Sequence, residues 1–180
     1  MKHSVRTLLS AAILGMAGLL PSSRAETFIW SAASAGPAST KANWRTNGVA
    51  AARLPGPADD IRLDGTSASD MAWNGGQNTG DGALSTAVNS WLQASPYTGT
   101  VTFSNLTYAS YSTTFTNFAI AGNCIISNGT WTHVPHPQDV VWSDNFLLRV
   151  TIGGSLEVAG PARISADGKG WWSHYDGAKA

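Results

Sequence analysis

The chain has 180 residues, of which only 12% are charged, and its 11 basic and 11 acidic residues give a formal net charge of zero. The sequence therefore contains no basic patch suited to nucleic acid, and its single cysteine, Cys124, excludes an intrachain disulfide. Eight tryptophans and many Thr, Val and Ile residues favour β-structure over a disordered chain.

The N-terminal segment, 1–25, has the features of a secretory signal peptide. Lys2 and Arg6 form a positively charged start, and a predominantly apolar run of 13 residues follows at 8–20. This run is too short to span a bilayer comfortably as a helix. The alternative is an uncleaved membrane anchor, which is disfavoured because Pro21 and the polar residues after it end the apolar run early.

We predict signal cleavage between Ala25 and Glu26, since Ser23 and Ala25 supply the small residues that precede a cleavage site. The remaining segment, 26–180, is long enough for one domain with a hydrophobic core. Loss of Lys2, Arg6 and Arg24 leaves 8 basic residues against 11 acidic ones, for a net charge of about −3. No part of the mature chain is apolar enough to form a transmembrane helix.

Short alternating runs separated by Gly, Pro, Asn and Asp predict strands along most of the mature chain. The best helical candidate, 39–53, is interrupted by Asn47-Gly48, where a turn is favoured. The predicted strands lie at 27–31, 60–64, 86–93, 99–105, 115–122, 124–128, 130–134, 146–154, 155–160 and 162–168.

The spacing of these strands indicates an all-β, short-stranded β-solenoid, a fold similar to a right-handed parallel β-helix, with an irregular β segment at its N-terminus. A β-sandwich uses longer strands, whereas each short strand of a solenoid spans one side of a coil. Residues 149–168 fit three sides of one coil of about 20 residues. Gly153-Gly154 and Gly160 are placed where the backbone bends and a side chain would obstruct it.

Alternation along the strands predicts which side chains face the interior. The residues expected to be exposed are Thr151, Glu157 and Arg163. The residues expected to be buried are Ile125, Val150, Ile152, Leu156, Val158 and Ile164.

The mature N-terminus, "FIWSAAS…KANWRTNGVAAARLPGPADDIRLDGT", resembles the opening module of large secreted bacterial surface proteins of the autotransporter-like class, which are built on β-strand repeats. The residues that carry this resemblance are Trp30, Asn43-Trp44, Pro55-Gly56, Asp59-Asp60 and Gly65. The later runs "YTGTVTFSNLTY", "IISNGTWTH" and "VTIGGSLEVAGPARISADGKGW" resemble coils of the same class. The resemblance implies an exported β-solenoid and no particular reaction.

We divide the chain into a signal peptide at 1–25, a Trp-, Gly- and Pro-rich β segment at 26–98, solenoid coils at 99–172 and a disordered tail at 173–180. Proteins of the resembling class are usually much longer than this chain. We therefore expect the chain to be the N-terminal part of a longer protein, with an open last coil that self-associates through unpaired strand edges.

Aromatic side chains are the first candidates for a binding site, because their faces can stack on sugar rings. Trp30, Trp44, Trp91 and Trp131 are embedded in strands or in the family pattern and are expected in the core. Adjacent residues of an extended chain point in opposite directions, so one of Trp171 and Trp172 must face outward. With Tyr175 they form the candidate carbohydrate-binding face.

Other chemistry is less favoured by the residue pattern. His133, His136 and Asp139 have a spacing that could bind zinc, but the prolines between them rule out a helix, and a polar loop is the preferred interpretation. Asp59 is expected to cap a turn rather than bind calcium, because the spacing of an EF-hand is absent. Cys124 lies in an apolar context and is expected to be a buried, inert thiol.

The sequence thus predicts an exported, non-enzymatic structural or adhesive module, secreted or on a bacterial cell surface, without catalytic residues, metal or cofactor. Its expected partners are surface polysaccharide or further coils of the same protein, with no nucleic acid and no membrane span after signal removal. The alternatives are a carbohydrate-binding module and the start of a polysaccharide-cleaving β-helix enzyme.

Overall fold

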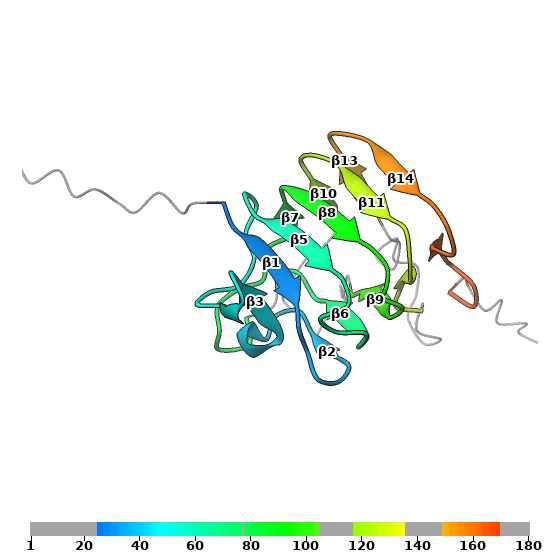
Figure 1. Cartoon of the computed structure of the whole chain (residues 1–180). Helices are drawn as coiled ribbons and strands as arrows, with labels where there is room; N and C mark the ends of the chain where they lie inside the picture. Colours follow the sequence, from blue (N-terminus) through cyan, green and yellow to red (C-terminus); the bar gives the residue numbers. More distant parts are fainter. Residues whose placement is uncertain (1–24, 77, 105–116, 136–148, 170–180) are drawn as a thin grey trace, which may run out of the picture.

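The computed structural model describes residues 25–76, 78–104, 117–135 and 149–169, which consist of short strands and one 3-10 helix (Figure 1). The first half contains β1 (Thr27–Trp30), β2 (Gly36–Pro37), η1 (Lys41–Asn43), β3 (Trp44–Thr46), β4 (Val49–Ala50), β5 (Asp60–Leu63), β6 (Met71–Trp73), β7 (Ala87–Val88) and β8 (Ser90–Gln93). The second half contains β9 (Thr100–Phe103), β10 (Phe118–Ile120), β11 (Cys124–Ile126), β12 (Thr130–His133), β13 (Val150–Ile152), β14 (Leu156–Val158) and β15 (Arg163–Ile164).

The described strands form three sheets that run side by side along the molecule. The largest has the order β14-β11-β8-β5-β1-β3-β4, the second β15-β12-β9-β6-β2 and the smallest β13-β10-β7. Successive coils pair in parallel within each sheet, as the stacked arrows of β5, β8, β11 and β14 show in Figure 1. The chain is a β-solenoid of about four turns, and the predicted fold class is confirmed.

One circuit of the solenoid is longer than the coil that the sequence predicted at 149–168. The first circuit runs from Thr27 to its parallel partner Asp60, and the second runs from Asp60 to Ser90. The next circuit runs from Trp91 to Cys124 and is again longer than the predicted coil. The prediction counted only the three strands of a coil and omitted the connections between coils.

Two rows of inward-facing residues in the largest sheet run from coil to coil and form part of the core. One row passes through Phe28, Ile61, Trp91, Cys124 and Leu156. The other passes through Leu63, Gln93, Ile126 and Val158. Except at the last coil, every side chain in these rows is buried. Residues at equal positions of neighbouring coils therefore stack on one another.

The prediction that Ile125 is buried is wrong, because Ile125 is half-buried and faces outward. Cys124 and Ile126 take the inward positions of β11, where they lie above Trp91 and Gln93 of the preceding coil. Two adjacent isoleucines leave the alternation ambiguous, and a slip of one residue exchanges the two faces of a strand. Pairing with β8 decides the register.

The predicted burial of the last coil is also wrong. Leu156, Val158 and Ile164 are 51%, 43% and 47% exposed. Val150 and Ile152 are only half-buried, although they pack against the core. The inward orientation was correct, since Leu156 and Val158 continue the rows of Cys124 and Ile126, but no described coil covers them.

Three outward positions of the last coil were predicted correctly. Thr151, Glu157 and Arg163 are exposed. Alternation along the strand therefore gave the direction of these side chains even where it misjudged the burial of their neighbours.

The N-terminal end of the solenoid is closed by a hairpin that the list of predicted strands omitted. β3 pairs antiparallel with both β1 and β4. Asn47 and Gly48 connect β3 and β4 with φ angles of 52° and 80°, both in the left-handed region that tight hairpin turns require. The turn expected at Asn47-Gly48 is thus confirmed, and the helical candidate at 39–53 retains only the short η1.

The parallel pairing begins at β1 and continues across the division that the sequence analysis placed between residues 98 and 99. β6 and β8, before that division, pair with β9 and β11 after it. The described residues on its two sides therefore belong to the same three sheets.

Glycine at the corner between β13 and β14 is required by close approach of two coils. A Cβ atom at Gly153 would collide with the backbone oxygen of Ala121, and one at Gly154 would lie 2.8 Å from that of Gly122. Gly160 has a φ of 61°, which few side chains tolerate. The reasons given for these glycines from the sequence are confirmed.

Candidate functional site

The sugar-stacking residues proposed from the sequence, Trp171, Trp172 and Tyr175, lie outside the described residues. His136 and Asp139 of the zinc candidate lie outside them as well. Ala25 and Glu26, which flank the predicted cleavage site, are described.

Five tryptophans of the described chain form a ladder inside the solenoid. They are Trp30, Trp44, Trp73, Trp91 and Trp131, and each is at most 1% exposed. Their rings make edge-to-face contacts, for example between Trp91 and Trp131 at a centroid distance of 5.2 Å and between Trp30 and Trp44 at the same distance. Such rings bury a large apolar surface and stabilise the core, so these five tryptophans are not a surface platform for sugar. The core interpretation of Trp30, Trp44, Trp91 and Trp131 is confirmed.

Trp44 has a further role at the N-terminal end of this ladder. It belongs to the closing hairpin, and its ring contacts those of Phe28, Trp30 and Trp73. Its indole N–H donates to the backbone oxygen of Ala38 at 2.7 Å. The side chain therefore seals the interior of the first coil.

Gln93 is a polar residue inside the apolar row, and it is fully buried. Its Oε1 accepts a hydrogen bond from the indole of Trp131 at 2.9 Å, and its Nε2 donates to the backbone oxygen of Asn128 at 2.7 Å. A buried amide is tolerated when its polar atoms are paired. Gln93 thus links two successive coils and has a structural role.

Two potential nucleophiles or ligands are held in structural positions. Cys124 is fully buried, and burial raises the pKa of its thiol to about 12, so the reactive thiolate is suppressed. His133 is buried, and its Nδ1 lies 2.8 Å from the backbone oxygen of Val134. In the ranges that the structure describes, no three His, Cys, Asp or Glu side chains come together as a metal site.

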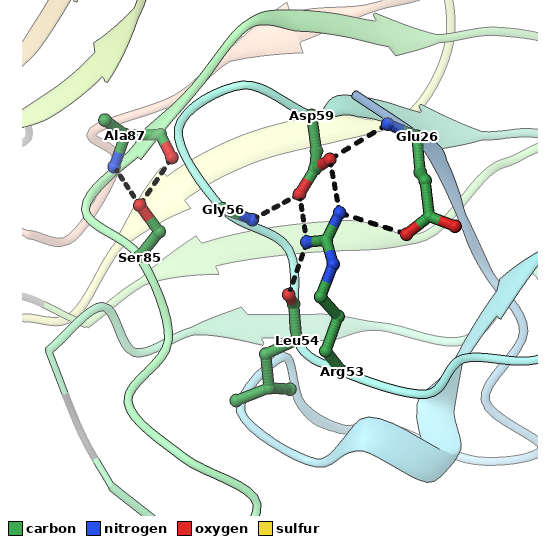
Figure 2. A network of polar contacts seen from close by, with 7 residues as sticks. All are labelled: Glu26, Arg53, Leu54, Gly56, Asp59, Ser85 and Ala87. Carbon is green, nitrogen blue, oxygen red and sulfur yellow. Dashed lines mark hydrogen bonds and ion pairs between the residues drawn. The ribbon is translucent and has the colours of Figure 1, made fainter. Parts of the chain in front are cut away.

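The densest polar arrangement in the described chain surrounds Asp59, just before β5 (Figure 2). The carboxylate is only 1% exposed. It accepts hydrogen bonds from the backbone N–H groups of Glu26 at 2.9 Å and of Gly56 at 2.7 Å. Both terminal nitrogens of the Arg53 guanidinium also donate to it, one of them at 2.8 Å. We call Glu26, Arg53, Gly56 and Asp59 the Asp59 cluster.

Arg53 joins this cluster to the first strand. Its guanidinium lies 3.0 Å from the Glu26 carboxylate and donates to the backbone oxygen of Leu54 at 3.1 Å. It also lies over the ring of Phe28, 4.9 Å from the ring centre, where a cation is attracted to the aromatic face. The guanidinium therefore bridges two carboxylates and covers a core residue.

The electrostatics of the cluster keep Asp59 ionised. Burial alone would raise the pKa of the Asp59 carboxyl, but the hydrogen bonds from Arg53, Glu26 and Gly56 outweigh it and lower that pKa below its ordinary value. The same pairing raises the pKa of Arg53 above its ordinary value, chiefly through the hydrogen bond to Asp59. The ion pair is thus the stable state over the whole physiological range.

This arrangement suits Asp59 for fixing the fold rather than for proton transfer. Both carboxylate oxygens already accept strong hydrogen bonds, and the lowered pKa makes the group a poor base. The carboxylate joins residue 26, which precedes β1, to the turn that precedes β5. The turn role expected for Asp59 is confirmed. Ser85, also drawn in Figure 2, closes its own turn by donating to and accepting from the backbone of Ala87.

Sequence reasoning found Asp59 but missed its partners Arg53 and Glu26. A signal was present, because Arg53 and Asp59 flank the Pro55-Gly56 turn with opposite charges. A turn that brings its two ends together also brings such charges together. Glu26, by contrast, is far from Asp59 in the sequence, and no local pattern indicated that the two residues meet.

Comparison with known proteins does not add a family to this picture. No protein-family model, no curated protein and no solved structure matches the chain. In the part of the chain that the structure describes, no helix has the length and apolar character needed to cross a membrane.

Proposed function

We propose that the protein is an exported, non-enzymatic structural or adhesive module, secreted or displayed on a bacterial cell surface. The observation that carries this proposal is the last described coil of the parallel stack, which no other described coil covers. Leu156, Val158 and Ile164 continue the apolar rows of the interior and remain about half exposed. Such a surface suits the addition of further strands or coils.

Export is supported by the segment 1–25, with its positive start, apolar run and small residues before Glu26. To test it, the full chain is expressed with its leader in a Gram-negative host, and the fractions are analysed by N-terminal sequencing and intact mass. We expect protein outside the cytoplasm that begins at Glu26. Cytoplasmic protein that retains residues 1–25 would contradict export.

The structural role is tested by self-association of the processed protein. We expect sedimentation velocity over a hundredfold concentration range to show concentration-dependent assembly. A double variant, Leu156→Lys with Val158→Lys, should weaken the assembly, whereas Thr151→Lys on the outer face of β13 should leave it unchanged. A monomer at every concentration would overturn the proposal that the open coil is an assembly surface.

A glycan array separates this proposal from a carbohydrate-binding module. Because the five described tryptophans are buried, sugar binding would depend on other aromatic residues, and Trp171, Trp172 and Tyr175 are the candidates. Glycan binding that Trp171→Ala abolishes would favour the carbohydrate-binding module. Absence of binding by the unaltered protein would favour the structural module.

A further inference from the structure

The backbone nitrogen of Glu26 is held against a buried carboxylate. It lies 2.9 Å from Oδ1 of Asp59, whose side chain is almost completely buried. On the other side of the same residue, the backbone oxygen of Glu26 accepts a hydrogen bond from the N–H of Asp60 at 2.9 Å. Glu26 is thus held by Asp59 on one side and by the start of β5 on the other, while the preceding Ala25 is exposed.

The side chains around this nitrogen do not balance in charge. Asp59 and Glu26 each carry a negative charge, and Arg53 is shared between them. Together the three side chains have a net charge of −1. The neighbouring carboxylate of Asp60 is engaged elsewhere, since the side chains of Asn89 and Ser90 donate to it. One further positive charge beside Asp59 would therefore neutralise the group.

We propose that signal cleavage completes this site, because the α-ammonium group released at Glu26 forms an ion pair with Asp59 and fixes the mature amino terminus to the first coil. The inference rests on the cleavage position given in the proposed function. Hydrolysis of the bond between Ala25 and Glu26 adds one water molecule. The carbonyl of Ala25 becomes a carboxylate that leaves with the leader, and the nitrogen of Glu26 becomes a protonated amine.

Cleavage changes the strength of the contact without requiring the nitrogen to move. Before cleavage a neutral amide donates one hydrogen bond to Asp59. After cleavage the same nitrogen has three N–H donors and a full positive charge, so an attraction between two opposite charges is added to the charge-assisted hydrogen bond that the amide already makes. The attraction is strong because the carboxylate is buried in a medium of low dielectric, and under this proposal it exceeds the cost of partly desolvating the ammonium group. The mature chain is therefore more stable than a chain extended at residue 25.

The ion pair has a defined dependence on pH. The carboxylates of Asp59 and Glu26 favour the charged amine and raise its pKa, whereas Arg53 opposes them in part. A group whose pKa is raised on folding stabilises the protein below its unfolded value, about 7.7–8.0 for an α-amine. This stabilisation disappears as the pH rises through the higher pKa of the folded state.

The experiment compares two chains that both run to Ala180 and differ only at their first residue. One begins at Glu26 and the other at Ala25, each released from a fusion by a protease that leaves no extra residue. Urea unfolding is measured from pH 6 to pH 11, and the α-amine is titrated by NMR. We expect at least a tenfold larger folding constant for the Glu26 chain at pH 7, with the difference lost at high pH. We also expect the pKa of its amine to lie at about 9 or higher, against an ordinary value of about 7.7–8.0.

Asp59→Asn in the Glu26 chain should return the amine to its ordinary pKa, whereas Asp60→Asn, the adjacent control, should not. Should Asp59→Asn fail to fold, the titration of the unaltered Glu26 chain still decides the question. Equal folding constants for the two chains, together with an ordinary amine pKa, would overturn the inference. N-terminal sequencing of the exported protein tests the cleavage position separately, so a failure of the proposed export is distinguishable from a failure of the ion pair.

Discussion

In the first coil Phe28 and Trp30 point inward and are fully buried, whereas in the last coil Leu156 and Val158 point inward and remain about half exposed. The two regions have the same alternation, and Phe28 and Leu156 belong to the same row of the interior. They differ in what covers them. The hairpin of β3 and β4 closes the first coil through Trp44, whereas no described coil lies beyond β14. Alternation thus sets the direction of a side chain, and a neighbouring coil sets its burial.

The two ends also differ in polar contacts. The Asp59 cluster joins the start of β1 to the turn before β5, and its carboxylate accepts bonds from three residues. In the last coil Asp167 is exposed, and its backbone N–H donates to the hydroxyl of Ser165 in the same turn. This contact is local to its turn, and the side-chain hydrogen bonds that join the last coil to the preceding one, from Thr151 to Asn117 and from Ser155 to Asn123, are exposed rather than buried. The first coil is therefore the more firmly held end of the described stack.

The largest effect that we expect comes from placing a charge at the covered end of one interior row. The same charge at the exposed end of that row is the comparison. Leu63→Asp buries an unpaired carboxylate and should cost about 4 kcal/mol or more, enough to prevent folding. Val158→Asp occupies the same row at its exposed end and should cost less than about 1 kcal/mol. Urea unfolding followed by tryptophan fluorescence measures both. Equal losses would show that Val158 is as well covered as Leu63.

A smaller effect is expected when the Asp59 cluster is broken. Asp59→Asn should cost about 2 kcal/mol, less than the loss typical of a fully buried ion pair, because Arg53 remains about one-third exposed. Since the pKa of Asp59 is lowered, its stabilisation is complete above about pH 3.9 and is lost as the pH falls through the lower folded value. The variant should lose this acid dependence. Asp167→Asn in the last coil is the control and should change stability by less than about 0.5 kcal/mol.

Two buried tryptophans test how much an indole hydrogen bond contributes to stability inside the solenoid. Trp131 lies next to the last coil, opposite Ile164, and donates to Gln93. The indole nitrogen of Trp91, one coil deeper, is buried and has no hydrogen-bond partner among the described residues. Trp131→Phe should therefore cost about 1 kcal/mol more than Trp91→Phe, because it leaves the buried Oε1 of Gln93 without its donor. Thermal unfolding of both variants measures the difference. A larger loss of stability for Trp91→Phe would contradict the stabilising role of the hydrogen bond between Trp131 and Gln93.

The smallest effect is expected on the outer face of the open coil. Glu157 faces outward between Leu156 and Val158 and is exposed. Glu157→Ser should change stability by less than about 0.5 kcal/mol, as surface substitutions usually do. A loss similar to that of Leu63→Asp would mean that the outer and inner faces of β14 are exchanged.

The sequence by itself determined the fold class and most of the strands. Short alternating runs separated by glycine predict short strands that each form one side of a coil. Gly153 and Gly160 lie at the corners of such a coil, where a side chain would collide with the backbone or would strain it. It also predicted that Trp30, Trp44, Trp91 and Trp131 belong to the core and that Asp59 belongs to a turn. These features are local, because each follows from a residue and its near neighbours.

Tertiary structure decided the register, the burial and the partners. Ile125 and Ile126 are equivalent in composition, and only pairing with Trp91 and Gln93 of the preceding coil selects which one faces inward. The exposure of Val158 likewise depends on whether another coil covers it. Alternation within one strand does not predict this. Glu26 and Asp59 are far apart in the sequence and meet because β1 and β5 are paired one circuit apart. Contacts between coils depend on the length of a whole circuit, and that length is set by the stacking of the sheets rather than by any short run of residues.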